Sequence, residues 1–184
     1  MINYALIAEA ERFYQNYGYQ LIDVPWIVSE QISNITLPPG KKAFSALNDF
    51  ESVPYYHQTL VGSAEQAFMQ MRWDGALENG RYVATSPCFR DESDSTHFSQ
   101  FMKVELIEVR KQRAYTHGDV LRMVDTALLF FRQYRDDIRV INTADGYDIV
   151  TNDDLELGSY GSRYYPHIGH WIYGTGLALP RFEM

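Results

Sequence analysis

Hydrophobic and polar residues recur along this chain with two different periods, which predict its helices and strands. Apolar residues repeat at helical spacing from Asn3 to Tyr17, where Gly18 interrupts the pattern. A second helix is expected over Glu65–Leu77, and a third follows the apolar stripe from Val120 to Phe131. These three patterns predict amphipathic helices that lie outside a sheet.

Alternating segments predict the strands of that sheet. Tyr19–Val24 predicts a strand that Pro25 ends, because proline cannot donate to a ladder. Met102–Arg110 alternates regularly and predicts a strong strand. Shorter strands are expected at 81–85, Ile138–Asn142, Tyr147–Thr151 and Trp171–Leu179, and an exposed loop at 34–42. Strands that cluster in the middle and end of the chain predict an α+β fold with a mainly antiparallel sheet.

Length and composition predict one soluble domain over residues 1–184. With 46% hydrophobic residues and no apolar run long enough to span a membrane, we expect a cytoplasmic protein, and the acidic start of the chain argues against a signal peptide. Cys88, the only cysteine, excludes an internal disulfide and a multi-cysteine zinc cage, and we expect it to be buried. A net charge of −8 argues against a large tRNA-binding surface.

The stretch 86–109 contains the strongest candidate chemistry. Arg90 and Glu92 are two residues apart on one predicted strand, and Phe101, Lys103 and Glu105 share a face of the next. If the two strands pair as a hairpin, an arginine, carboxylates and an aromatic ring converge on one surface, as a nucleotide site requires. A solvated hairpin held by salt bridges would have the same composition, so both interpretations stand at this point.

The letters FRDE, HFSQF and KVEL in this stretch resemble motif 2 of class II aminoacyl-tRNA synthetases. The resemblance implies that Arg90 holds the α-phosphate of ATP and that Glu92 contacts the adenine or the far side of the nucleotide. It further implies that His97 reaches the γ-phosphate and that Phe101 stacks on the adenine. An arginine at the α-phosphate suits the negative charge that develops there during adenylation.

The segment GTGLALPRFEM at 174–184 is similar to motif 3, in the form typical of seryl-tRNA synthetases and other class IIa-type enzymes. This similarity implies that Arg181, at the start of a helix, binds the γ-phosphate and completes an arginine clamp with Arg90. We expect Gly174 and Gly176 to let a ligand lie against bare backbone. The segment 11–28 resembles motif 1, with Pro25 as its key residue, and implies a homodimer formed through that helix and strand.

Two shorter resemblances add residues to the site. LVGSAEQAF at 60–68 resembles a loop of seryl and related synthetases, which implies that Glu65 binds the α-amino group of the substrate. DLELGSYGSR at 154–163 resembles the strand before motif 3, which implies that Glu156 holds Mg²⁺ and that Ser159 and Arg163 lie near the amino-acid pocket. Glu105 is a second candidate for the substrate amine, and His170 is a further candidate for the pocket lining.

Three departures from the family limit what the resemblance implies. The loop between Glu92 and His97 is short for one that reaches tRNA, and we see no anticodon-binding domain. The chain stops just past Arg181, so we expect either a piece of a longer protein or a reduced core that lacks the helix after motif 3. With one cysteine, a zinc-free amino-acid pocket is expected.

The leading hypothesis is a ligase that uses ATP and Mg²⁺ to activate an amino acid as its adenylate, with Arg90 and Arg181 as the catalytic residues. The acceptor of the acyl group is then a molecule other than a full tRNA, and its identity stays open. A second hypothesis is a non-catalytic paralogue that binds an amino acid or nucleotide and regulates a partner, although such a protein has less need of both arginines. A third is a synthetase fragment or catalytic subunit that charges tRNA with a separate tRNA-binding subunit.

Overall fold

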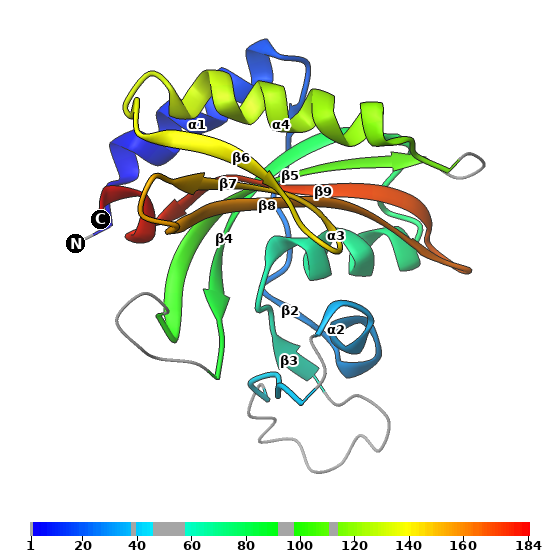
Figure 1. The fold of residues 1–184 in the computed structure, drawn as a ribbon. Coiled ribbons are helices and arrows are strands. Elements are labelled where there is room, and N and C mark those ends of the chain that lie inside the picture. Colours follow the sequence, from blue (N-terminus) through cyan, green and yellow to red (C-terminus); the bar gives the residue numbers. More distant parts are fainter. Residues whose placement is uncertain (1, 38–39, 46–57, 92–97, 111–113) are drawn as a thin grey trace.

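A seven-stranded, mainly antiparallel sheet is the dominant element of this protein (Figure 1). The computed structural model describes residues 2–37, 40–45, 58–91, 98–110 and 114–184. In spatial order the strands are β1 (Gln20–Leu21), β4 (Gly80–Phe89), β5 (Gln100–Arg110), β9 (Gly169–Leu179), β8 (Glu156–Tyr165), β7 (Gly146–Thr151) and β6 (Ile138–Asn142). The described pairings are antiparallel except that of β1 with β4, so the predicted α+β fold is confirmed.

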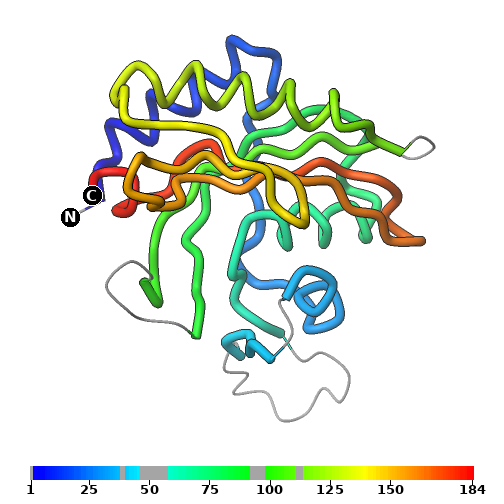
Figure 2. Tube along the Cα trace, in the orientation of Figure 1, coloured from blue at the N-terminus to red at the C-terminus, as the bar shows by residue number. Residues whose placement is uncertain are grey.

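Helices cover both faces of the sheet (Figure 1). On one face lie α1 (Tyr4–Asn16) and α4 (His117–Phe131), and on the other lies α3 (Ala64–Trp73). Beyond α3 are α2 (Glu30–Thr36) and a small sheet of β2 (Ile27–Ser29) and β3 (Gln58–Leu60). The 3-10 helix η1 (Arg181–Glu183) ends the chain beside its start, as Figure 2 shows, and Asn3 Nδ2 donates a hydrogen bond of 2.9 Å to Glu183 Oε1.

The sheet separates two hydrophobic clusters, and the α3 side also carries the polar residues described below. The α1 and α4 side is packed with aromatic rings, among them the fully buried Tyr14 and Tyr160. Helix α4 begins where its sequence favours it, because Thr116 and Asp119 form a reciprocal capping box. The α3 side is anchored by the fully buried Trp171. Cys88 is also buried, as expected. None of the helices in the described ranges has the length and apolar character that crossing a membrane requires.

Several predicted element bounds differ from those observed. The strand expected at Tyr19–Val24 is reduced to the two residues of β1, because the chain pairs only briefly with β4 before it turns away. The loop predicted at 34–42 begins too early, because α2 continues to Thr36. The Ser29 side chain caps this helix, and Ile32 is buried. Helix α3 ends at Trp73, since Gly75 adopts a positive φ of 73° that stops the helix.

Gly174 and Gly176 on β9 have a role different from the one expected. A Cβ on Gly174 would lie 2.5 Å from the Tyr160 ring, and a Cβ on Gly176 would lie 2.7 Å from the Tyr14 ring. Both rings belong to the cluster under α1 and α4, so these glycines make room for core aromatics. The Tyr14 hydroxyl also donates a hydrogen bond of 2.8 Å to the Gly176 carbonyl oxygen.

This packing predicts that Gly176→Ala lowers the free energy of unfolding by about 1–3 kcal/mol, because the added methyl group overpacks a core that cannot move aside. Urea denaturation measures the difference. Gly118→Ala is the control: it lies in the first turn of α4, where an added Cβ would find its nearest neighbour at 3.7 Å. Equal stability of the Gly176→Ala protein and the wild type would contradict the assignment.

Candidate active site

A cavity of about 380 Å³ opens on the α3 side of the sheet. Of the eleven site residues predicted from the sequence, nine lie in the described ranges, and eight of these nine line this cavity: Glu65, Arg90, Phe101, Glu105, Glu156, Ser159, Arg163 and Arg181. The other two, Glu92 and His97, lie outside the described residues. Residues from β5, β8, α3, the turn after β4 and the chain end therefore meet at one place, which their distances along the sequence do not reveal.

Arg90 is fixed at one wall of the cavity. It follows the last residue of β4, so the prediction that it lies on the strand itself is wrong by one residue, although its backbone N–H still bonds to the Ser99 carbonyl oxygen across the hairpin. Its Nε donates a hydrogen bond of 3.1 Å to the Gly62 carbonyl oxygen, and its guanidinium lies 5.1 Å from the centre of the Phe101 ring. A guanidinium held this way presents a planar set of donors that suits a phosphate.

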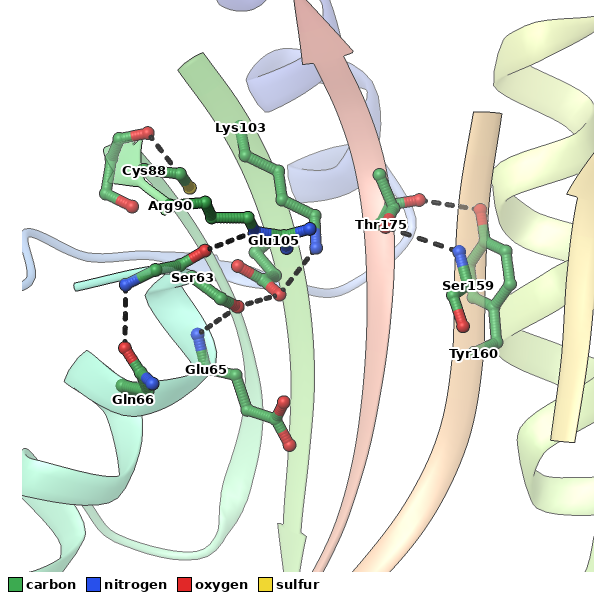
Figure 3. Close-up of polar contacts among 12 residues, drawn as sticks. Ser63, Glu65, Gln66, Cys88, Arg90, Lys103, Glu105, Ser159, Tyr160 and Thr175 are labelled. Carbon is green, nitrogen blue, oxygen red and sulfur yellow. Dashed lines mark hydrogen bonds and ion pairs between the residues drawn. The ribbon is translucent and has the colours of Figure 1, made fainter. Parts of the chain in front are cut away.

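Glu105 is the most deeply buried carboxylate of the cavity, with 1% of its surface exposed. Its Oε1 accepts hydrogen bonds from Ser63 Oγ at 2.6 Å and from Lys103 Nζ at 2.9 Å (Figure 3). Its Oε2 is buried and has no hydrogen-bond partner among the described residues. Burial alone would raise the pKa of Glu105, but the Lys103 ammonium, the Ser63 hydroxyl and the Arg90 guanidinium together lower it, so this carboxylate is ionised.

Glu65 differs from Glu105 because both of its oxygens are engaged. Oε2 accepts from Arg163 Nη1 at 2.5 Å, and Oε1 accepts from Trp171 Nε1 at 2.7 Å. Burial raises the pKa of Glu65, against the effects of Arg163 and Trp171. The Arg163 guanidinium also lies 4.2 Å from the centre of the Tyr173 ring. The Glu65 carboxylate therefore holds the Arg163 guanidinium in place in the cavity lining.

A row of polar side chains crosses four strands along the cavity floor. Glu105 on β5 pairs with Thr175 on β9, and Ser159 on β8 pairs with Asp148 on β7. The backbone N–H of Ser159 donates to Thr175 Oγ1 at 3.4 Å, which joins the two halves (Figure 3). All four residues line the cavity. The sequence prediction missed Thr175 and Asp148. The signal that could have identified Thr175 is a polar residue among apolar neighbours on a predicted strand, and Thr175 is buried in the structure.

Arg181 and Glu156 lie side by side in the cavity lining. Arg181 Nη1 lies 3.5 Å from Glu156 Oε1 and 3.5 Å from the Glu156 carbonyl oxygen. Arg181 opens η1, as the sequence predicted for a helix start. Within the described part of the chain, no group of three or more histidine, cysteine, aspartate or glutamate side chains is arranged to hold a metal ion.

His170 does not belong to the site. It lies on β9, near the turn that joins β8 to β9, where its ring packs 4.5 Å from that of Tyr164. It is not among the residues that line the cavity, so its assignment to the pocket is wrong. The reason is its position on β9: His170 pairs with Arg110, five residues before Thr175, which pairs with Glu105 at the cavity.

Comparison with known proteins reveals similarity in structure without similarity in sequence. No protein-family model and no curated protein sequence matches this chain. The serine-tRNA ligase of Naegleria fowleri, solved in complex with AMP, superimposes with a TM-score of 0.74 at 17% identity, over 96% of this chain and 46% of that one. This chain thus spans less than half the length of that ligase.

Two solved structures of pyrrolysyl-tRNA synthetase from Desulfitobacterium hafniense give similar results. They superimpose with TM-scores of 0.73 and 0.72, each at 17% identity, over 98% of this chain and 67% of theirs. At this level of identity the similarity establishes the fold, and function has to be argued from the site. The chain has the fold of a class II aminoacyl-tRNA synthetase catalytic domain.

Proposed function

We propose that this protein activates an amino acid with ATP, forming an aminoacyl adenylate, and passes the acyl group to an acceptor other than a full tRNA. The observation that carries the proposal is the cavity itself. It brings together on this fold a fixed arginine, an aromatic ring and a buried carboxylate with one oxygen that has no hydrogen-bond partner among the described residues. The net charge of −8 supports an acceptor other than tRNA, because binding the phosphate backbone requires a basic surface.

The residues of the cavity fit a nucleotide. Its volume of about 380 Å³ lies within the range of small-molecule sites, which begins at about 300 Å³. Phe101 offers a ring face to the adenine, and Arg90 beside it would bind the α-phosphate. Arg181, which also lines the cavity, would bind the γ-phosphate. Glu92 and His97 would complete the nucleotide contacts by resemblance to motif 2.

Glu156 is the residue that would hold Mg²⁺, since it lies beside Arg181 at the wall proposed for the outer phosphates. A carboxylate that shares this wall with an arginine suits a hard cation bound mainly by phosphate oxygens and water. Bound Mg²⁺ would neutralise part of the phosphate charge. This arrangement needs few protein ligands.

The reaction needs positioning and charge stabilisation more than acid–base chemistry. A carboxylate oxygen of the amino acid forms a bond to the α-phosphorus, while the bond from that phosphorus to the pyrophosphate oxygen breaks. Both the attacking and the leaving groups are already anionic, so no side chain has to move a proton. Arg90 would stabilise the charge that develops on the α-phosphate, and Arg181 the departing pyrophosphate.

The amino acid would be held beside the phosphates by Glu105. Glu105 lines the cavity, and its Oε2 has no hydrogen-bond partner in the described part of the chain, so this oxygen would accept a hydrogen bond from an ammonium group. Ser63 and Lys103 fix the carboxylate through its other oxygen. Ser159 and the Glu65–Arg163 pair would shape the rest of the pocket. ATP–pyrophosphate exchange tests this function, because labelled pyrophosphate enters ATP only when an adenylate forms reversibly.

We further propose that the protein is a homodimer through the region of Pro25, as the resemblance to motif 1 implies. Exposed large side chains support this location: 43% of Tyr17, 38% of Leu21, 57% of Trp26 and 44% of Ile27 is exposed. Apolar surface of this kind is typical of an interface. The residues lie at the end of α1 and in β1 and β2, on one continuous stretch of chain.

For this interface we expect Trp26→Ala to weaken dimerisation about 30-fold or more, because a tryptophan at the centre of an interface commonly contributes at least 2 kcal/mol. Analytical ultracentrifugation over a concentration series measures the dissociation constant. Trp73→Ala is the matched control, because Trp73 is 38% exposed on α3, a different part of the surface. A Trp26→Ala protein that dimerises as tightly as the wild type contradicts the proposed interface.

A further inference from the structure

The polar row on the cavity floor ends in an unpaired carboxylate oxygen at each side. At the β5 end, Glu105 Oε2 is buried without a hydrogen-bond partner, and at the β7 end the same is true of Asp148 Oδ1, within the ranges that the structure describes. Between them lie Thr175 and Ser159, whose hydroxyl oxygens can accept or donate. A buried acceptor without a donor costs free energy, so a ligand that brings two donors would satisfy both ends.

The surroundings of Asp148 favour a positively charged donor. Burial raises the pKa of Asp148, the Glu156 and Asp145 carboxylates act in the same direction, and a hydrogen bond with Ser159 opposes them. Asp145 and Glu156 also line the cavity. Glu156 is paired with Arg181, but no ion pair to Asp148 is formed within the described part of the chain. This end of the cavity therefore has negative charge that a substrate cation would balance.

A substrate with an acidic side chain is disfavoured, because the Arg163 guanidinium already has a carboxylate partner. The Arg163 guanidinium lines the cavity, but it is already paired with Glu65 and packed on the Tyr173 ring. Binding a substrate carboxylate there would leave Glu65, which is 5% exposed, without its counter-charge. Breaking a buried pair in this way is strongly unfavourable.

We propose, on the basis of the adenylation function above, that the activated substrate is a diamino acid, with its α-ammonium group on Glu105 and its side-chain ammonium group on Asp148. Adjacent strands are about 4.8 Å apart, so three strand spacings place the two α-carbons about 14 Å from each other. The two protein side chains and their hydrogen bonds occupy part of that span. The remainder suits a side chain of several methylene groups, such as that of ornithine or lysine.

The test compares each diamino acid with the neutral amino acid that lacks only its terminal amine. ATP–pyrophosphate exchange is measured with 2,4-diaminobutyrate, ornithine and lysine, and with 2-aminobutyrate, norvaline and norleucine as the matched set. We expect kcat/KM for the best diamino acid to exceed that of its neutral match about 10- to 100-fold, as a charge-assisted hydrogen bond in a buried site allows. Asp148→Asn keeps the shape of the side chain and should bring the ratio of kcat/KM for the diamino acid to kcat/KM for its neutral match close to 1.

Two results would overturn the proposal: neutral amino acids that match or exceed the diamino acids, or an Asp148→Asn protein that keeps the preference. Calorimetric binding of the same amino acids, with a non-hydrolysable ATP analogue present, separates this proposal from the adenylation function. Binding of a diamino acid that is lost in Asp148→Asn, without exchange, supports the subsite and contradicts adenylation. Exchange driven only by neutral amino acids supports adenylation and contradicts the subsite. The absence of both binding and exchange contradicts the subsite and adenylation alike.

Discussion

Replacing Arg90 with alanine should lower the rate of ATP–pyrophosphate exchange by about 100- to 1000-fold, the usual cost of removing one donor that stabilises transition-state charge. Arg90 is held by the Gly62 carbonyl oxygen and by the Phe101 ring, so its guanidinium is positioned before the substrate arrives. Arg90→Lys should recover only part of the rate, because an ammonium group keeps the charge but loses the planar set of donors.

The control for this prediction is Arg139→Ala. Arg139 lies on β6 and pairs with Asp154, outside the residues that line the cavity, so exchange should be unchanged. Thermal unfolding of each variant verifies that the protein is folded. An Arg90→Ala protein that is folded and exchanges at the rate of the wild type would show that Arg90 does not stabilise the reaction.

Glu105→Gln should raise KM for the amino acid about 10- to 100-fold while ATP affinity stays the same, because a neutral amide cannot match a carboxylate as the partner of an ammonium group. Steady-state exchange at varied amino-acid concentration gives KM, and titration with an ATP analogue gives the nucleotide affinity. Glu108→Gln is the matched control on the same strand. Glu108 pairs with Arg110 and does not line the cavity, so KM should not change.

Glu105→Gln should also change how the free energy of unfolding depends on pH. The pKa of Glu105 in the folded protein is lowered from its ordinary value of 4.5, so the stabilisation that its ionised form provides is fully present above about pH 4.5. It is lost as the pH falls through the lowered pKa. Acid unfolding of Glu105→Gln should therefore show less dependence on pH below 4.5 than the wild type. An unchanged KM together with an unchanged acid profile would contradict the assigned state of Glu105.

Local patterns in the sequence were sufficient for the elements with strong periodicity. The stripe from Val120 to Phe131 predicted α4, and the bounds of β6 agree with Ile138–Asn142. Elements that depend on tertiary contacts were predicted less well. Helix α2 has only seven residues and is stable because Ile32 is buried, while β1 consists of the two residues that reach β4.

The sequence prediction missed Thr175 and Asp148 of the polar row, because their neighbours depend on the register in which the strands pair. Between Val104 and Glu105 the pairing of β5 with β9 shifts by one residue, and this bulge places Thr175 opposite Glu105. The residue that the pairing skips is Gly176, and a glycine within a strand often marks a bulge, but β9 also contains Gly174, so the sequence does not fix the register. A second shift, between Ile149 and Val150, follows the position where Asp148 pairs with Ser159. Gly176 is likewise explained only by the Tyr14 ring, which is distant in sequence.

One measurement decides whether this protein forms adenylates: ATP–pyrophosphate exchange by the wild-type protein with Mg²⁺, with each common amino acid and the diamino acids tested in turn. The proposed function predicts exchange that depends on one amino acid or a small related set and that is lost in Arg90→Ala and Arg181→Ala. Exchange with none of them, from folded protein that binds ATP, would contradict adenylation and favour a protein that binds the nucleotide without using it.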